Sequence, residues 1–207
     1  MARYTGPNCR LCRRSGDKLF LKGSKCFNNC TFDKRPTPPG PKPTRRRRTS
    51  ERGDQLRDKQ RARYIYGILE RQFRRTFGEA ERAGGVTGDN LMVILERRLD
   101  NVVYRLGFAD SRSQARQLVR HGHIRVGEHS NNVPSALIDE GDAISFTEAS
   151  KKTEYYKTLL ESIKSKAVPN WLSLDRETLA GKVLSLPTPD EAEAKFSGKT
   201  IVEYYSR

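Results

Sequence analysis

The sequence predicts an α+β fold, in which an N-terminal metal-binding arm and a helical domain precede a second domain with short strands. Four cysteines fall within the first 30 residues as two closely spaced pairs. Apolar residues then recur at helical spacing over residues 51–82 and 89–106. From Ile124 the pattern changes to short apolar runs bounded by turn residues, which is typical of strands.

The four cysteines have the spacing of a metal site. Cys9, Cys12, Cys26 and Cys30 form the pattern C-x2-C-x13-C-x3-C, which can bring four thiolates around one soft cation. We expect one zinc ion, whose binding would supply folding energy to a segment with little core. A four-iron iron–sulfur cluster uses the same ligands and is the alternative metal group. Reduced thiols or two disulfides are the alternatives without a metal.

The net charge of +15 is concentrated in the first two-fifths of the chain. Residues 1–82 hold 23 Lys and Arg against 8 Asp and Glu, whereas residues 83–207 hold 17 of each. This excess favours an anionic partner, nucleic acid above all, over a basic surface that is merely solvated. No apolar run approaches the roughly 20 residues of a membrane span, and no leader is apparent, so we expect neither a membrane protein nor a secreted precursor.

A proline-rich linker follows the cysteines. Residues 37–44 read T-P-P-G-P-K-P-T, which excludes a helix because proline lacks a backbone donor and fixes φ. Four consecutive arginines come next, at Arg45, Arg46, Arg47 and Arg48. Such a run can lie along a phosphate backbone.

One long basic helix is predicted over residues 51–82. Its apolar stripe consists of Ile65, Ile68, Leu69, Phe73 and Phe77. Arginines fall on the opposite side, namely Arg63, Arg71, Arg74, Arg75 and Arg82. One face would then pack on protein while the other meets phosphates.

Two further helices are predicted before the strands. The first spans residues 89–106, and the second begins at Ser111, which forms a capping-box pattern with Gln114. Its arginines recur every four residues and so share one face. The predicted edge for recognising nucleic acid comprises Arg112, Arg116, Arg120, His121 and His123. Charge reversal at Arg112 and Arg116 is expected to weaken this binding without unfolding the protein.

The remaining segments mix strands with one helix. We predict strands at 124–126 and 143–146, a helix over 150–166, and short extended pieces at 171–172, 182–186 and 200–205. The pairs Tyr155–Tyr156 and Tyr204–Tyr205 can stack on bases, although at least one member of each is expected in the core. No catalytic triad or phosphate-binding glycine loop is present in the sequence, so no enzyme is predicted.

A run beginning at Arg98 resembles the S-four RNA-binding module. It reads RLDNVVYRLG to Gly107, then Ser111-Arg112, ARQLV at 115–119 and HGHI at 121–124. The resemblance implies two packed helices lying against a small antiparallel sheet. This module occurs in several kinds of RNA-binding protein.

The flanking segments resemble the small-subunit ribosomal protein S-four family of bacterial type. They are ARYTGP at 2–7, the four cysteines, KRP at 34–36, PPG at 38–40, YGI at 66–68, ERQFR at 70–74, Pro169, Trp171-Leu172 and IVEYYSR at 201–207. Two segments depart from the family pattern. Residues 41–48 replace the Gln-His-Gly expected after Pro-Pro-Gly, and the loop 127–132 lacks the usual Asn-Gly turn.

The resemblance implies a structural constituent of the small ribosomal subunit without catalysis. It implies a primary binder of the 5′ domain of small-subunit rRNA that nucleates assembly of the subunit body. Contributions to translational accuracy and to the region where mRNA enters are implied too, with the fifth and third small-subunit proteins as neighbours and no small-molecule substrate. The expected location is the cytoplasmic ribosome, or an organellar ribosome. In the arm, Arg3, Arg13 and Arg14 are the expected RNA contacts.

The predicted organisation has four parts. Residues 1–44 form the arm and linker, and residues 45–96 form a basic helical domain joined by the tail 183–207. Residues 97–160 form the RNA-binding module, and residues 161–182 complete the second domain.

Two other functions use some of the same features. An RNA-modifying enzyme such as a pseudouridine synthase would carry the same module, but it needs a catalytic domain for which few residues are left. A zinc-dependent DNA-binding regulator would place a recognition helix beside its cysteines, whereas here a proline linker and arginines follow them.

Overall fold

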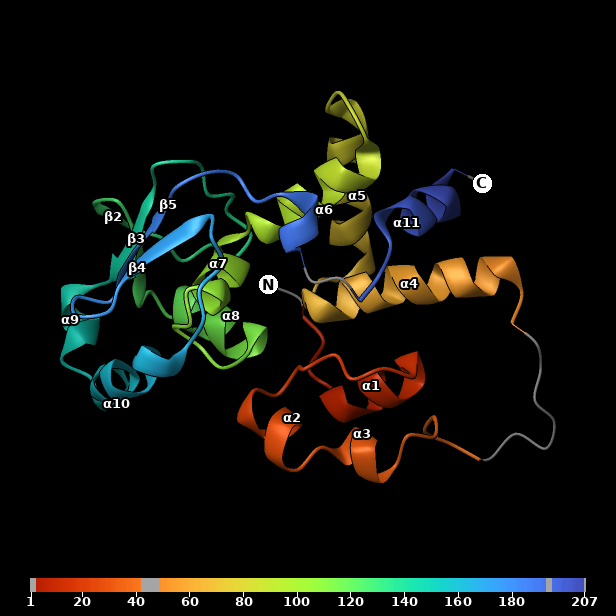
Figure 1. Cartoon of the computed structure of the whole chain (residues 1–207), viewed down its shortest axis with the longest axis horizontal. Helices are drawn as coiled ribbons and strands as arrows, with labels where there is room; N and C mark the ends of the chain where they lie inside the picture. The colour runs from red at the N-terminus through yellow and green to blue at the C-terminus, as the bar shows by residue number, and fades with distance from the viewer. Residues whose placement is uncertain (1–2, 42–48, 193–194, 207) are drawn as a thin grey trace. The chain divides into compact units, whose positions relative to one another are not determined.

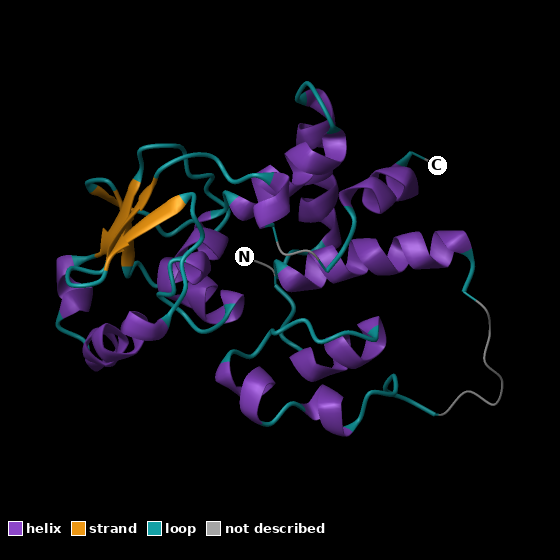
Figure 2. Cartoon of the chain, in the orientation of Figure 1, coloured by secondary structure: helices purple, strands orange, loops and turns teal. Residues whose placement is uncertain are grey.

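The chain forms two compact units. The computed structural model describes residues 3–41, 49–192 and 195–206 (Figure 1). Unit 1 comprises residues 1–92 and 193–207, and unit 2 comprises residues 93–192. Helices make up the described part of unit 1, whereas unit 2 combines helices with a sheet (Figure 2). The α+β class is confirmed.

Three short helices form the arm of unit 1. They are α1 (Asn8–Ser15), α2 (Ser24–Asn28) and α3 (Thr31–Lys34). α1 ends at Gly16, which adopts a left-handed φ of 74° and donates its N–H to the Cys12 carbonyl at 3.0 Å. This turn sends the chain back toward α2, so that the two cysteine pairs can meet.

The predicted helix over 51–82 is two helices, α4 (Glu51–Ile65) and α5 (Glu70–Arg82). The break is a Schellman turn. Gly67 has φ 64°, and Ile68 donates its N–H to the Arg63 carbonyl at 3.0 Å. A single helix was therefore a wrong prediction, because an apolar stripe continues across a turn that only glycine adopts without strain.

The C-terminal segment is also helical. Residues 200–205 were predicted to be extended, but they belong to α11 (Gly198–Tyr205), which Ser197 caps. α11 packs in unit 1, where Tyr205 lies 4.5 Å from Phe77 between ring centroids. A Cβ on Gly88 would lie 3.0 Å from the backbone of Gly198, so the two segments approach at backbone contact.

The predicted helix over 89–106 is likewise broken. α6 (Thr87–Glu96) and α7 (Leu99–Arg105) are separated by an extended Arg98, which forms a β-bridge with Leu137. Backbone hydrogen bonds join Leu99 to Ala136 at 2.8 Å and Ile138 to Arg97 at 3.0 Å. The helix ends here because the backbone groups of Arg97 and Leu99 form hydrogen bonds with residues 136–138.

Unit 2 places helices against an antiparallel sheet of order β2-β1-β3-β5-β4. Its strands are β1 (Ile124–Val126), β2 (His129–Ser130), β3 (Ala143–Phe146), β4 (Leu172–Asp175) and β5 (Ala180–Val183). The predicted strands at 124–126 and 143–146 are confirmed. A Cβ on Gly181 would lie 2.5 Å from Leu106, so α7 packs directly on β5.

Unit 2 contains further helices besides α7. α8 (Arg112–Arg120) begins at the predicted cap, where Ser111 Oγ accepts the Gln114 N–H at 3.3 Å. The predicted helix over 150–166 is divided into α9 (Glu148–Lys151), α10 (Glu154–Ser162) and η1 (Ile163–Ser165), and η2 (Pro189–Glu191) precedes the return to unit 1. Thr153 causes the division, because its hydroxyl caps α10. No helix in the described ranges is long and apolar enough to cross a membrane.

Candidate nucleic-acid interface and cysteine site

Arg116 lies inside unit 2, with 9% of its surface exposed. Its guanidinium donates to Asp100 at 2.8 Å, and Arg98 donates to the same carboxylate at 2.7 and 3.1 Å. This contradicts the expectation that Arg116 lies on an RNA-facing edge. Charge reversal there would bring two carboxylates together in the interior, so we now expect such a variant to be strongly destabilised.

Arg112 is half-buried and oriented by neighbouring protein groups. It donates Nε–H to Asn101 Oδ1 at 2.8 Å and lies over the Tyr104 ring at 4.5 Å. Asn101 donates in turn to Glu96 at 2.7 Å, and Arg105 holds the same carboxylate through two contacts of 2.9 Å. This network fixes the guanidinium of Arg112 at the first residue of α8.

The two histidines of the predicted edge differ. His123 is half-buried, with Nδ1 2.8 Å from the Ser150 hydroxyl, which also contacts Thr147 at 2.7 Å. His121 and Arg120 are exposed at the end of α8. Of the five residues of the predicted edge, only Arg120 and His121 are exposed. The half-buried Arg112 lies at the other end of α8.

The arginines of α5 face solvent. Arg71, Arg74 and Arg82 are exposed, and the Arg75 side chain is 82% exposed beside Glu79 at 3.1 Å. Phe73, Phe77 and Ala80 of the same helix are buried. α5 therefore separates a packed apolar side from an arginine face, which we define as Arg71, Arg74, Arg75 and Arg82.

Arg63 does not belong to that face. It donates to Glu70 at 2.8 Å, and the buried Lys59 and the Tyr205 hydroxyl contact the same carboxylate at 2.8 and 2.9 Å. Burial acts to raise the pKa of Glu70, but the hydrogen bonds from Lys59, Arg63 and Tyr205 outweigh it and lower the pKa below its ordinary value. This cluster ties α11 to α4 and α5.

The Glu70 cluster should give unit 1 a pH-dependent stability. Because the folded pKa lies below the unfolded one, the stabilisation is fully present above the ordinary value of 4.5 and is lost as pH falls through the folded pKa. Glu70→Gln should lower the free energy of unfolding by about 1 kcal/mol at pH 7, a small value because the side chain is 43% exposed. Urea unfolding should show that the difference from the parent shrinks below pH 4.5. The control is Glu81→Gln on the exposed side of α5, and an equal effect of both variants would contradict the prediction.

In the arm, the Arg13 side chain forms a hydrogen bond within the protein. It donates Nε–H to the Thr37 carbonyl at 2.8 Å and so fixes the start of the proline linker. Arg3 and Arg14 are exposed. The predicted contacts Arg45, Arg46, Arg47 and Arg48 lie outside the described residues.

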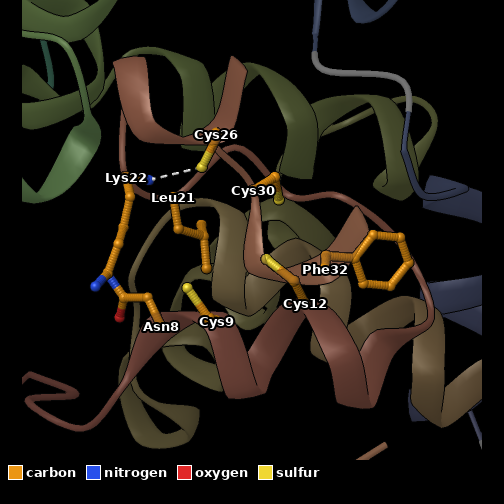
Figure 3. Close-up of a pocket in the computed structure, with 8 residues that line it drawn as sticks. All are labelled: Asn8, Cys9, Cys12, Leu21, Lys22, Cys26, Cys30 and Phe32. Carbon is orange, nitrogen blue, oxygen red and sulfur yellow. Dashed lines mark hydrogen bonds between the residues drawn. The ribbon is translucent and has the colours of Figure 1, made fainter. Parts of the chain in front are cut away.

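The four cysteines line one pocket, together with Asn8, Leu21, Lys22 and Phe32 (Figure 3). Cys9 and Cys12 project from α1 toward Cys26 and Cys30. All four are unbridged, and Cys12, Cys26 and Cys30 are buried. The structure thus gathers the four residues that the sequence pattern singled out.

The thiols of this pocket influence one another. Burial raises the pKa of Cys12, and the charges of the other three cysteines add to the increase. The Lys22 N–H donates to Cys26 Sγ at 3.3 Å, a contact that stabilises a thiolate. Four sulfur donors suit a soft cation such as zinc. Among the described residues, however, no three His, Cys, Asp or Glu side chains are arranged as a closed metal site.

The sequence patterns gave no indication of two features. The first is the role of Asp100, whose carboxylate joins two buried arginines. The contact of Lys59 and Tyr205 with Glu70 had no local signal either, since Tyr205 is 135 residues away from Glu70.

Comparisons with known proteins cover most of the chain. Residues 3–96 match the ribosomal protein S4/S9 N-terminal domain, and residues 97–144 match the S4 domain. The small ribosomal subunit protein uS4 of Dehalococcoides mccartyi (strain CBDB1) is 61% identical over 207 residues, which is all of both chains. The chain belongs to the uS4 family.

Other uS4 proteins extend this similarity. Halothermothrix orenii uS4 is 51% identical over 208 residues, and Symbiobacterium thermophilum uS4A is 53% identical over 208 residues, each across the full length of both chains. The resemblance predicted from the sequence is confirmed. uS4 proteins are structural proteins of the small ribosomal subunit, so the chain is not an enzyme, and the pseudouridine synthase alternative is ruled out.

Proposed function

We propose that the chain is an rRNA-binding structural protein of the small ribosomal subunit. The arginine face of α5 supports this most directly, because all four of its arginines are exposed. Arginine donates in pairs to phosphate oxygens, and folded RNA brings several backbones to one surface. Family membership supports small-subunit rRNA as the RNA that is bound.

The finer role follows the family resemblance. The proposed target is the 5′ domain of the rRNA, bound early enough to nucleate assembly of the subunit body. The chain would lie beside the third and fifth small-subunit proteins, near the path where mRNA enters. There it would contribute to translational accuracy. The proposed location is the cytoplasmic ribosome, as the bacterial relatives suggest.

Neutralising the arginine face should weaken RNA binding. For Arg71→Ala combined with Arg74→Ala, we expect at least a roughly tenfold loss of affinity for a small-subunit rRNA transcript at moderate salt, and a salt slope reduced by about 1 per lost phosphate contact. Filter binding across a salt series measures both. Arg176→Ala is the control, because this exposed arginine lies in unit 2 and donates to the Lys164 carbonyl at 2.8 Å. Unchanged affinity and slope in the double variant would disprove the role of this face.

We propose further that the cysteine pocket holds one zinc ion, with a four-iron cluster as the alternative. Cys9, Cys12, Cys26 and Cys30 would be the ligands, and the Lys22 N–H would support the thiolate of Cys26. The bound ion would cross-link the arm, which has little core of its own. Elemental analysis of the purified chain tests this, and visible absorption separates iron–sulfur from zinc. Protein with neither metal would exclude both.

A further inference from the structure

Two large aromatic rings of the arm are exposed, that of Phe27 and, at 43%, that of Tyr4. Phe27 is 71% exposed, the highest value among the large apolar side chains in the described ranges. It belongs to α2 and directly follows Cys26 of the cysteine pocket. Leaving a phenylalanine in water forgoes about 1.5–3 kcal/mol of burial, so a ring held outward on an ordered helix suggests that something covers it in a complex.

A second ring supports Phe27 from behind. The centroids of Phe20 and Phe27 lie 5.1 Å apart and their planes differ by 29°, which is a stacked pair. Phe20 has φ 50°, a conformation that costs a bulky residue on the order of 1–3 kcal/mol and persists only where its surroundings enforce it. Lys195 Nζ lies 4.1 Å from the Phe20 centroid and fixes it further. One face of Phe27 therefore meets Phe20, and the ring is otherwise open to solvent.

The surroundings of this ring are basic. Residues 3–41 contain nine Lys and Arg against two Asp. Lys22 and Lys25, close to Phe27 in sequence, are both exposed. A supported aromatic face beside cations is how proteins hold unpaired nucleotides, because the base stacks while the lysines neutralise its phosphates. The core of a protein–protein interface, by contrast, is depleted of lysine.

The two tyrosine pairs that were predicted to stack on bases contact other groups of the protein instead. Tyr156 is buried, and the Tyr155 hydroxyl donates to the Phe108 carbonyl at 2.6 Å. Tyr205 packs on Phe77, and Lys59 Nζ lies 4.7 Å from the centroid of Tyr204. These contacts leave the tyrosines less suited to a base than Phe27.

We propose that Phe27 is a stacking platform for one unpaired base of the rRNA, with Phe20 as its support. This rests on the proposed rRNA-binding function and deepens it. The arm would hold a nucleotide extruded from the helical stack, in addition to any contact with duplex phosphates. Lys22 and Lys25 would lie beside the backbone of that nucleotide.

Substitutions of Phe27 test this in the full chain with a small-subunit rRNA transcript. Phe27→Ala and Phe27→Leu should each weaken binding roughly tenfold, while Phe27→Tyr should bind as the parent does, because only an aromatic ring offers a π-face. The salt slope should not change, since no phosphate contact is lost. Val86→Ala removes another exposed apolar side chain, 65% exposed, and should have no effect.

A direct measurement accompanies these affinities. In Phe27→Trp, the fluorescence of the introduced tryptophan should be quenched when the transcript binds, because a base stacks on it. The fluorescence of the buried Trp171 should stay constant and serves as the reference. Chemical probing should show one base protected by the parent that becomes reactive with Phe27→Ala. Amide exchange of the free variants verifies that the arm stays folded.

The alternatives give different results. If Phe27→Leu binds like the parent, or if no fluorescence is lost on binding, the platform is refuted while the proposed function stands. If Phe27→Ala binds rRNA normally but enters reconstituted small subunits poorly, the ring contacts a protein and the proposal is wrong. A parent chain that fails to bind the transcript would overturn the proposed function together with the platform.

Discussion

Removing the proposed zinc ion should unfold the arm while unit 2 stays intact. The three arm helices have 8, 5 and 4 residues, too short to be stable alone, so their order would depend on the cross-link through four cysteines. Structural zinc contributes an apparent 10–16 kcal/mol or so in small zinc-folded peptides, which sets the scale of the effect. Hydrogen exchange with mass spectrometry, before and after chelation with EDTA, should show protection lost over residues 8–34.

A matched pair of variants separates metal loss from general damage. Cys12→Ser removes a buried thiol of the pocket and should abolish protection of the arm without chelator. Ser24→Ala changes an exposed residue at the start of α2 and should leave the arm protected. Full protection of Cys12→Ser, or of the parent chain shown to be free of metal, would mean that apolar packing alone orders the arm.

Asp100→Asn should destabilise unit 2 by about 3–5 kcal/mol, because two buried guanidinium groups would lose the carboxylate charge that they share. The substitution preserves the shape of the side chain, so the loss reflects charge rather than a cavity. Urea unfolding followed by near-ultraviolet circular dichroism measures it, since Trp171 reports on the packing of unit 2. Cooperative unfolding gives the free energy directly.

Two controls define the origin of that loss. Asp110→Asn breaks the surface pair with Lys166 at 2.8 Å and should cost no more than about 1 kcal/mol. Replacing Arg98, Asp100 and Arg116 together by Met, Leu and Met should restore most of the stability, because an apolar substitute leaves no buried charge without its counterpart. A triple variant as unstable as Asp100→Asn would contradict this explanation.

Several elements could be predicted because their signals are local. The α8 cap at Ser111 lies at the predicted position, since capping depends on neighbouring residues. The four cysteines, identified by spacing alone, line one pocket. The arginines of α5 face solvent because helical periodicity separates them from the phenylalanines.

Other elements depended on partners far along the chain. Residues 198–205 contain β-branched and aromatic side chains suited to a strand, yet they form a helix that packs in unit 1 through Tyr205. The helix predicted over 89–106 breaks at Arg98, because Leu137 pairs with it. In both cases tertiary contacts outweighed local preference.

The candidate interface shows the same limit. Periodicity correctly placed Arg112, Arg116 and Arg120 on one helix, but it does not distinguish a face that meets RNA from one that meets a buried carboxylate. Only the packing of α7 against α8 brings Asp100 within 2.8 Å of Arg116. Likewise, Phe27 has no periodic signal, and its support by Phe20 becomes visible only when the arm is folded.

The sequence by itself determined the family, the α+β class, the basic N-terminal half and the four-cysteine pattern. These features follow from composition and from short spacings along the chain, which do not depend on how distant segments pack together. The tertiary structure alone decided which arginines are internal, where two predicted helices break and how the exposed Phe27 ring is supported. Burial and long-range pairing decide such questions, because they set the cost of each charge and each apolar surface after the whole chain has packed.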